Sequence, residues 1–130
     1  MSKKLLRGVL VDVEKEIVEI MEIEDELEEF YRILNCTCID ITVRCIGSNK
    51  QYRIVCDDEA LCKSEPKISA VDYYGQVQLC GNLFIVGGEI DDGNLVSLTE
   101  SEAQRILRLV KKIPTKKHPD GYPILIQCTY

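Results

Sequence analysis

One run of alternating residues, from position 38 to 56, constrains the fold of this chain most, because it predicts a β-hairpin. Two-residue alternation over this length is typical of a half-buried strand. The turn signal Gly47-Ser48-Asn49-Lys50 separates the two expected strands, Cys38–Ile46 and Gln51–Cys56. In the first strand we expect one apolar and one polar face: Ile39, Ile41, Val43 and Cys45 against Cys38, Asp40, Thr42 and Arg44. The hairpin therefore indicates an antiparallel sheet.

Apolar, β-branched runs elsewhere predict the remaining strands. Gly81-Asn82 fits either a tight turn between two strands or a bulge within one strand, and both alternatives stay open. The stretch from Pro66 to Gly75 is expected to be an irregular loop. The first two strands are expected to pair through a turn at residues 12–15. The expected strands outside the hairpin are Leu5–Val13, Glu16–Ile23, Val77–Cys80, Leu83–Val86, Leu95–Leu98 and Tyr122–Tyr130.

Two segments have helical patterns. From Asp25 to Leu34 an apolar stripe recurs every three or four residues, and Asn35 is a plausible C-terminal stop. A second helix is expected to begin at Thr99, where Glu102 completes a capping box, and to run to about Ile113. About six strands and two helices predict a single α+β domain over residues 1–130, with a largely antiparallel sheet.

Charge and hydropathy exclude several classes of protein. The net charge of -6 argues against direct binding of nucleic acid, because such proteins are normally basic. The apolar runs reach only about four residues, too short to cross a membrane. Asp12 and Glu14 interrupt the N-terminal apolar stretch too early for a signal peptide, so we expect a cytoplasmic protein.

The cysteines and the single histidine restrict the chemistry. Seven cysteines, an odd number in a chain without an export signal, are expected to stay reduced and mostly structural. Cys36 and Cys38 form the only close pair, with a spacing that does not suit zinc, so we expect neither a metal nor a cofactor. His118 lies in a polar, turn-like string, and no phosphate-binding glycine loop is present. We therefore expect a non-catalytic protein. A weaker alternative is a Mg²⁺-dependent enzyme using Asp57-Asp58-Glu59, which otherwise cap a turn.

Charge is distributed unevenly along the chain. Residues 12–29 contain ten acidic side chains and one base, whereas residues 105–117 contain six bases and no acid. The acidic segment is either a DNA-mimicking surface or a solvated acidic face that aids solubility. The basic segment fits phosphate binding or ordinary complementation of a helix end.

Several strings resemble a known family when taken together. They are Ile39-Asp40-Ile41, the run from Tyr52 to Glu59, Gly81-Asn82-Leu83-Phe84-Ile85, Ser97-Leu98-Thr99-Glu100 and the ending Gln127-Cys128-Thr129-Tyr130. Their order and spacing, over nearly the whole chain, resemble domain of unknown function 3846. Ala60 stands where that family usually has Gly. The resemblance implies an origin in phages and mobile elements of Gram-positive bacteria. By analogy it implies interference with host defence, either by sequestering a nucleotide signal or by mimicking DNA.

We expect the chain to bind a small nucleotide-like ligand as a homo-oligomer. Such a pocket needs aromatic faces for a base, cations for phosphate, a carboxylate for a ribose hydroxyl and an amide for a base edge. The candidates for stacking on a base are Tyr73 and Tyr74, and those for phosphate are Arg44, Arg53 and Lys63. The candidate for a ribose hydroxyl is Asp58 or Glu59, and the candidate for a base edge is Asn82. Alternatively the tyrosines pack against the fold, and the two arginines pair with Asp40 or another acid. The alternative function is an acidic inhibitor or DNA mimic that acts on a host nucleic-acid enzyme.

Overall fold

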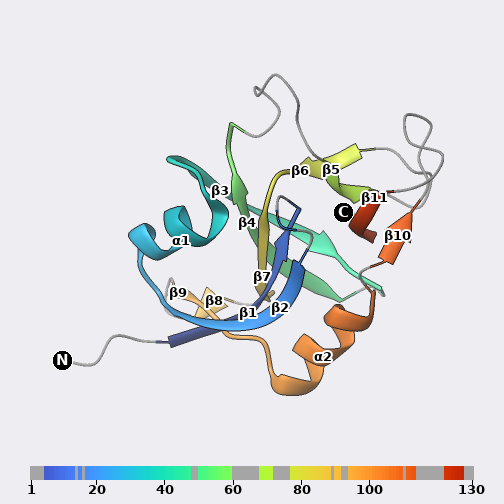
Figure 1. Cartoon of the computed structure of the whole chain (residues 1–130). Helices are drawn as coiled ribbons and strands as arrows, with labels where there is room; N and C mark the ends of the chain where they lie inside the picture. The colour runs from blue at the N-terminus through green and yellow to red at the C-terminus, as the bar shows by residue number, and fades with distance from the viewer. Residues whose placement is uncertain are drawn as a thin grey trace.

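The expected hairpin forms one edge of a five-stranded antiparallel sheet (Figure 1). Its strands are β3 (Ile39–Cys45) and β4 (Gln51–Asp57), paired from Cys45 opposite Gln51 to Ile39 opposite Asp57. The structure is a computed structural model. It describes residues 5–13, 15, 17–47, 50–59, 68–71, 77–88, 90–91, 94–109, 111–113 and 122–127.

The expected pairing of the two N-terminal strands is confirmed. Strand β1 (Leu5–Asp12) pairs with β2 (Ile17–Glu24), and β7 (Leu83–Gly87) lies between β1 and β4. The strand order is β2-β1-β7-β4-β3. Every residue of β7 is buried, because this central strand has a hydrophobic layer on both faces.

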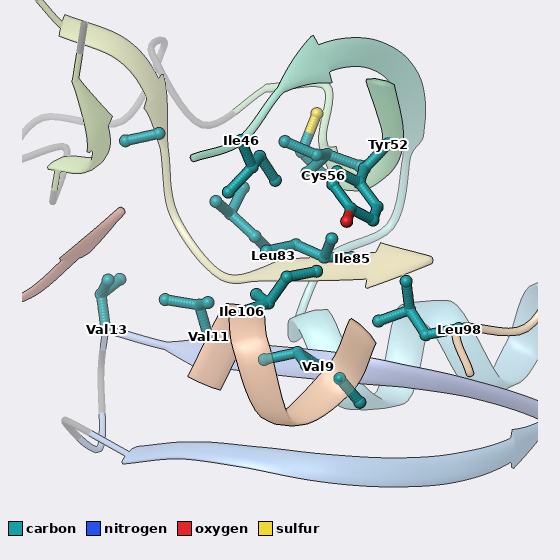
Figure 2. Packing of buried hydrophobic residues seen from close by; sticks show 13 residues of the cluster. Val9, Val11, Val13, Ile46, Tyr52, Cys56, Leu83, Ile85, Leu98 and Ile106 are labelled. Atoms are coloured by element: carbon teal, nitrogen blue, oxygen red, sulfur yellow. The ribbon is translucent and has the colours of Figure 1, made fainter. Parts of the chain in front are cut away.

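Two helices lie on opposite sides of this sheet (Figure 1). Helix α1 (Leu27–Leu34) ends at Asn35, whose φ of 52° is left-handed, as expected for a C-terminal stop. Its side of the sheet includes Phe30 packed against Phe84, with ring centroids 6.2 Å apart. On the other side, Ile106 of helix α2 (Glu100–Leu109) packs in a cluster with alternate residues of the sheet (Figure 2).

A second, smaller sheet packs on the same face of the large sheet as α2. It contains β5 (Ile68–Val71), β6 (Val77–Cys80), β10 (Lys111–Ile113) and β11 (Tyr122–Gln127) in the order β10-β11-β5-β6. The β11–β5 pair is parallel and the other two are antiparallel. Ala70 of β5 joins the core cluster of α2. The two-residue strands β8 (Ile90–Asp91) and β9 (Asn94–Leu95) form a separate pair. Nowhere in the described ranges is a helix long and apolar enough to cross a membrane.

The α+β prediction is confirmed, but several local expectations are wrong. Gly81-Asn82 separates two strands, β6 and β7, as one of the two alternatives predicts. The two strands do not pair with each other, because the chain passes from the small sheet to the large one at Gly81, whose φ is 79°. The expected loop after Pro66 contains β5. The strand expected at 95–98 includes only Leu95.

The second helix is shorter than its sequence pattern suggests. It ends at Leu109, and residues 111–113 form β10 instead of a last helical turn. Proline disfavours helical backbone in the residue before it, and Pro114 follows directly. Pairing of β10 with β11 supplies the hydrogen bonds that the helix would otherwise have made.

The start of α2 is the capping box that the sequence predicts. Thr99 Oγ1 accepts a hydrogen bond from the Glu102 amide at 3.2 Å, and Glu102 Oε1 accepts one from the Thr99 amide at 3.1 Å. Both bonds satisfy amides that the helix itself leaves without partners.

Removing this cap is expected to destabilise the protein. Thr99→Ala should lower the free energy of unfolding by about 1 kcal/mol, because the Glu102 amide loses its acceptor. Thr99→Ser, which keeps the hydroxyl, should stay much closer to wild type. Urea denaturation of the three proteins measures both effects, and equal losses in the two variants would contradict the cap.

Candidate functional site

A cleft of about 500 Å³ opens beside the first turn of α2. Four segments far apart in the sequence form it: the start of β4, the end of β7, the stretch before α2, and α2 itself. Its volume lies within the range of small-molecule sites. The lining residues are Lys50, Gln51, Gly87, Gly88, Val96, Ser97, Thr99 and Glu102.

Two adjacent glycines make one wall of the cleft. The Gly87 amide donates a hydrogen bond to Val96 O at 2.8 Å, which ties the end of β7 to the segment before α2. A side chain at Gly87 would lie 2.8 Å from the same oxygen, and one at Gly88 would clash with Gln51 O. Only glycine therefore allows these backbones to approach so closely, and the wall exposes backbone rather than side chains.

The charged groups of the cleft are Lys50 and Glu102, which form an ion pair. Burial opposes ionisation of Glu102, but the bonds from Lys50 and Thr99 outweigh it and hold the pKa of Glu102 below its ordinary value. The hydrogen bond to Glu102 raises the pKa of Lys50. Both groups are therefore charged at neutral pH. The Lys50 side chain is 55% exposed, so its ammonium is accessible to a ligand.

A second cation lies close to Lys50. The Arg105 guanidinium donates to Tyr52 Oη at 2.9 Å and to Ile46 O at 3.1 Å. It also lies over the Tyr52 ring, 5.9 Å from the centroid, with Lys50 Nζ 5.7 Å from the same centroid. Tyr52 is fully buried, and its hydroxyl and ring hold Arg105 close to Lys50, although Arg105 does not itself line the cleft.

Hydroxyl groups complete the lining. Ser97 Oγ accepts the Arg7 amide proton at 2.9 Å, which leaves the Ser97 hydroxyl hydrogen available as a donor. Thr99 Oγ1 lies 3.3 Å from Ser101 Oγ. A cation, a carboxylate and hydroxyls around an open cleft suit a small polar molecule that carries both an anionic group and hydroxyl groups.

The structure does not bring the predicted ligand residues together. Arg44 is paired with Tyr52, and Arg53 is paired with Val43 and Val86. Residues paired across strands share a face, so the two arginines lie on opposite faces of the sheet. A single phosphate cannot then be held by both of them.

The alternation of the sequence also predicts that Arg44 lies on the polar, exposed face of its strand, and this prediction is wrong. Only 7% of the residue is exposed, and its Nη1 donates to Thr42 Oγ1 and, at 2.9 Å, to Val43 O. The apolar residue Ile41 is instead 42% exposed. Since β3 is an edge strand, its apolar face is covered less completely than the faces of the inner strands. Arg53 is half-buried, and its Nε has no hydrogen-bond partner in the described structure.

The other candidates have structural contacts or lie elsewhere. Asn82 is buried, and its Oδ1 accepts a hydrogen bond from the Val13 amide at 3.0 Å. Asp58 and Glu59 are exposed after β4, where Asp57 Oδ1 accepts from the Glu59 amide at 2.9 Å, as in a turn. Their ligand roles stay predictions. Outside the described residues lie Lys63, Tyr73, Tyr74, Ala60, His118, Cys62 and Cys128.

Sequence reasoning missed the cleft because its residues have ordinary local explanations. Gly87 and Gly88 are typical of a turn, and Glu102 is typical of a helix cap. Lys50 belongs to a hairpin turn. No spacing rule joins these segments, because they meet only after β4 and β7 pair.

The acidic segment is spread over two faces. Glu19 and Glu22 of β2 are both exposed, and strand alternation places them on opposite sides of the sheet. Arg7 binds Glu22 at 3.0 Å, and Arg32 binds Glu29 at 2.6 Å. This arrangement does not favour a single DNA-like strip of carboxylates.

The described cysteines form no disulfide, and no metal-binding cluster occurs in the part of the chain that is described. Cys56 is buried, and its thiol donates to Asp40 O at 3.6 Å. Burial, aided by the negative charge of Asp40, raises the pKa of the Cys56 thiol from 9.0 to about 11. The thiol is therefore protonated and a weak nucleophile at neutral pH.

Comparison with known proteins supports the resemblance seen in the sequence. A family model described as Domain of unknown function (DUF3846) matches residues 6–111. Neither the curated proteins nor the solved structures gave a match.

The Cys56 thiol is expected to make stability depend on pH. Because its pKa is raised on folding, its contribution is complete below pH 9 and is lost as the pH rises through about 11. Between pH 8 and pH 11, wild type should lose about 2 kcal/mol more than Cys56→Ala, which has no thiol to ionise. Urea denaturation at both pH values measures the difference. Parallel losses in the two proteins would contradict the burial of this thiol.

Proposed function

Because this chain belongs to the family described as Domain of unknown function (DUF3846), whose description gives no reaction, we propose a function from its own geometry. The protein binds a small nucleotide-like ligand without transforming it, in the cleft beside α2. The observation that carries this proposal is the cleft itself, which places an exposed ammonium beside a carboxylate and two hydroxyls.

Each part of such a ligand has a suitable partner in the cleft. Lys50 is the donor for a phosphate group, with Arg105 adding positive charge nearby. Glu102 and Ser97 can accept from and donate to ribose hydroxyls. Val96 and the glycine wall offer a small side chain and open backbone against which a flat base can lie.

The charge state of the ion pair favours binding over catalysis. An efficient general acid or base has a pKa near the operating pH. The pKa of Lys50 is raised and that of Glu102 is lowered, so both move away from neutrality. The pair can therefore fix charges in a ligand but is poorly suited to exchange protons with it.

The cellular role that follows from this proposal is sequestration. A protein that holds a nucleotide signal without consuming it lowers the free concentration of that signal. On this proposal the protein is encoded by a phage or mobile element and is located in the bacterial cytoplasm. There it inhibits an immune response of the host. The dispersed carboxylates of β2 and α1 give the DNA-mimic alternative no comparable support.

Thermal unfolding with a panel of nucleotides, cyclic dinucleotides and ADP-ribose derivatives tests the proposal. A ligand at about a hundred times its dissociation constant stabilises by roughly 2.7 kcal/mol, which corresponds to a shift on the order of 8–16 °C. One compound class should produce such a shift. The absence of any shift across the panel would contradict a nucleotide-like ligand and direct the search to a protein partner.

Substitution of Lys50 then locates the site. With the compound that shifts the wild type, Lys50→Ala should weaken affinity by about 10- to 100-fold, because a charge-assisted hydrogen bond is lost. Lys15→Ala removes an equal charge at the exposed β1–β2 turn and should bind like wild type. Arg53→Ala, on the other face of the sheet from Tyr52, should also retain binding. Loss of binding in Arg53→Ala with retention in Lys50→Ala would place the ligand outside the cleft.

A further inference from the structure

The Glu102 carboxylate is a fixed part of the cleft wall. Its Oε1 accepts a hydrogen bond from the Thr99 amide at 3.1 Å, and its Oε2 accepts one from Lys50 Nζ. The Glu102 amide donates in turn to Thr99 Oγ1 at 3.2 Å. A carboxylate that is bonded at both oxygens cannot turn away from a ligand without breaking the cap of α2. Every ligand of the cleft therefore meets a negative charge at this position.

The position of Glu102 also determines its distance from a ligand phosphate at Lys50. An ammonium group directs its three hydrogen bonds tetrahedrally, so two acceptors bound to the same nitrogen are roughly 4–5 Å apart. Glu102 is one such acceptor of Lys50. A phosphate oxygen that also bonds to Lys50 therefore lies at roughly this distance from a carboxylate oxygen of Glu102.

The charge of the phosphate then decides how strongly Glu102 opposes binding. A terminal phosphate group carries close to two negative charges at neutral pH, whereas a phosphate esterified on two sides, a phosphodiester, carries one. At this distance in a water-like dielectric, each negative charge of the ligand lowers affinity by about fivefold. Repulsion by Glu102 therefore weakens binding of a terminal phosphate by roughly twentyfold, but binding of a phosphodiester by only about fivefold.

The rest of the described lining does not compensate for a second negative charge. Among the described lining residues Lys50 is the one cation, and Glu102 offsets much of its attraction. Arg105 adds positive charge nearby but does not line the cleft. The Gly87 amide is bonded to Val96 O, so it does not act as amides do in glycine-rich phosphate loops.

A cyclic nucleotide suits these donors and acceptors. Its phosphate is a diester that occupies the 3′-position of the ribose, so the Ser97 hydroxyl meets a phosphate oxygen in place of a ribose hydroxyl. Glu102 can accept the remaining 2′-hydroxyl, because each carboxylate oxygen has two lone pairs. A long phosphodiester polymer is disfavoured by the net charge of -6. Charge and hydrogen bonding together therefore favour a small cyclic nucleotide.

We infer that the cleft selects cyclic nucleotides over nucleotides that end in a phosphate group, and that Glu102 is the residue that makes this distinction. The inference rests on the proposed function and specifies the class of nucleotide. Selectivity of this kind arises from a repulsive contact with the wrong ligand as well as from attractive contacts with the right one.

Matched pairs of nucleotides test the selectivity. Isothermal titration calorimetry of the full chain, at about pH 8 and low salt, compares cyclic AMP with 5′-AMP and cyclic GMP with 5′-GMP. A third pair is cyclic di-AMP and the linear dinucleotide pApA, which ends in a phosphate group. Wild type should bind the cyclic member of a pair at least about fourfold more tightly, because the other member carries the additional charge.

Glu102→Gln separates the charge of this residue from its role in the cap. Glutamine accepts the Thr99 amide in a capping box as glutamate does, so the variant should fold, and circular dichroism checks this. Its affinity should rise roughly twentyfold for the member with a terminal phosphate and about fivefold for the cyclic member, so the preference should shrink by about fourfold. Glu100→Gln, in the first turn of α2 but not among the described lining residues, should keep the wild-type preference.

The outcomes separate this inference from the proposed function. Nucleotide binding without a preference for the cyclic member, or a preference that Glu102→Gln leaves unchanged, would overturn the inference and leave the proposed function in place. Failure of every compound to bind would overturn both. If Glu102→Gln does not fold, wild type at about 1 M salt replaces it, because screening beyond about 3 Å should reduce a preference that arises from charge.

Discussion

Burial of β7 on both faces is the constraint on which the rest of the structure depends. Leu83, Phe84, Ile85 and Val86 are all fully buried, although side chains alternate between faces along a strand. Such a strand is stable only if both faces of the sheet are covered. Phe84 and Val86 pack in the cluster that contains α1, and Leu83 and Ile85 pack in the cluster that contains α2. The two helices and the small sheet are therefore needed to cover the strand that holds β1 and β4 together.

The cleft follows from the way this central strand ends. Glycine at 87 and 88 lets the chain pass directly over the backbone of Gln51, so β7 leaves the sheet without a side chain in the way. The Gly87–Val96 hydrogen bond then fixes the segment that leads into α2. The start of α2 is thus placed beside the start of β4, and the space between them is the cleft.

The sequence indicates those parts of the fold that depend on neighbouring residues. The 38–56 hairpin, the β1–β2 pair and the Thr99 capping box could all be predicted, because alternation, turns and caps are local signals. Residues 77–80 and 83–86 look like a hairpin but enter different sheets, since long-range pairing with β5 and β1 outweighs the local turn. Similarly, Arg44 follows the polar phase of β3 yet is buried, because alternation within one strand does not indicate which face packs against the rest of the fold. Arg44 shares its face with the buried Tyr52. The cleft needed contacts among four segments and could not be found from spacing.

The Glu102 carboxylate both caps α2 and binds Lys50, and these two roles limit which substitutions position 102 can accept during evolution. The same carboxylate accepts the Thr99 amide at the start of α2 and holds the Lys50 ammonium across the cleft. A change at position 102 alone would therefore disturb a helix terminus and a binding surface together. Compensated changes are easier to tolerate than single ones when residues are coupled in this way. Positions 50, 99 and 102, distant in the sequence, should therefore covary among related chains.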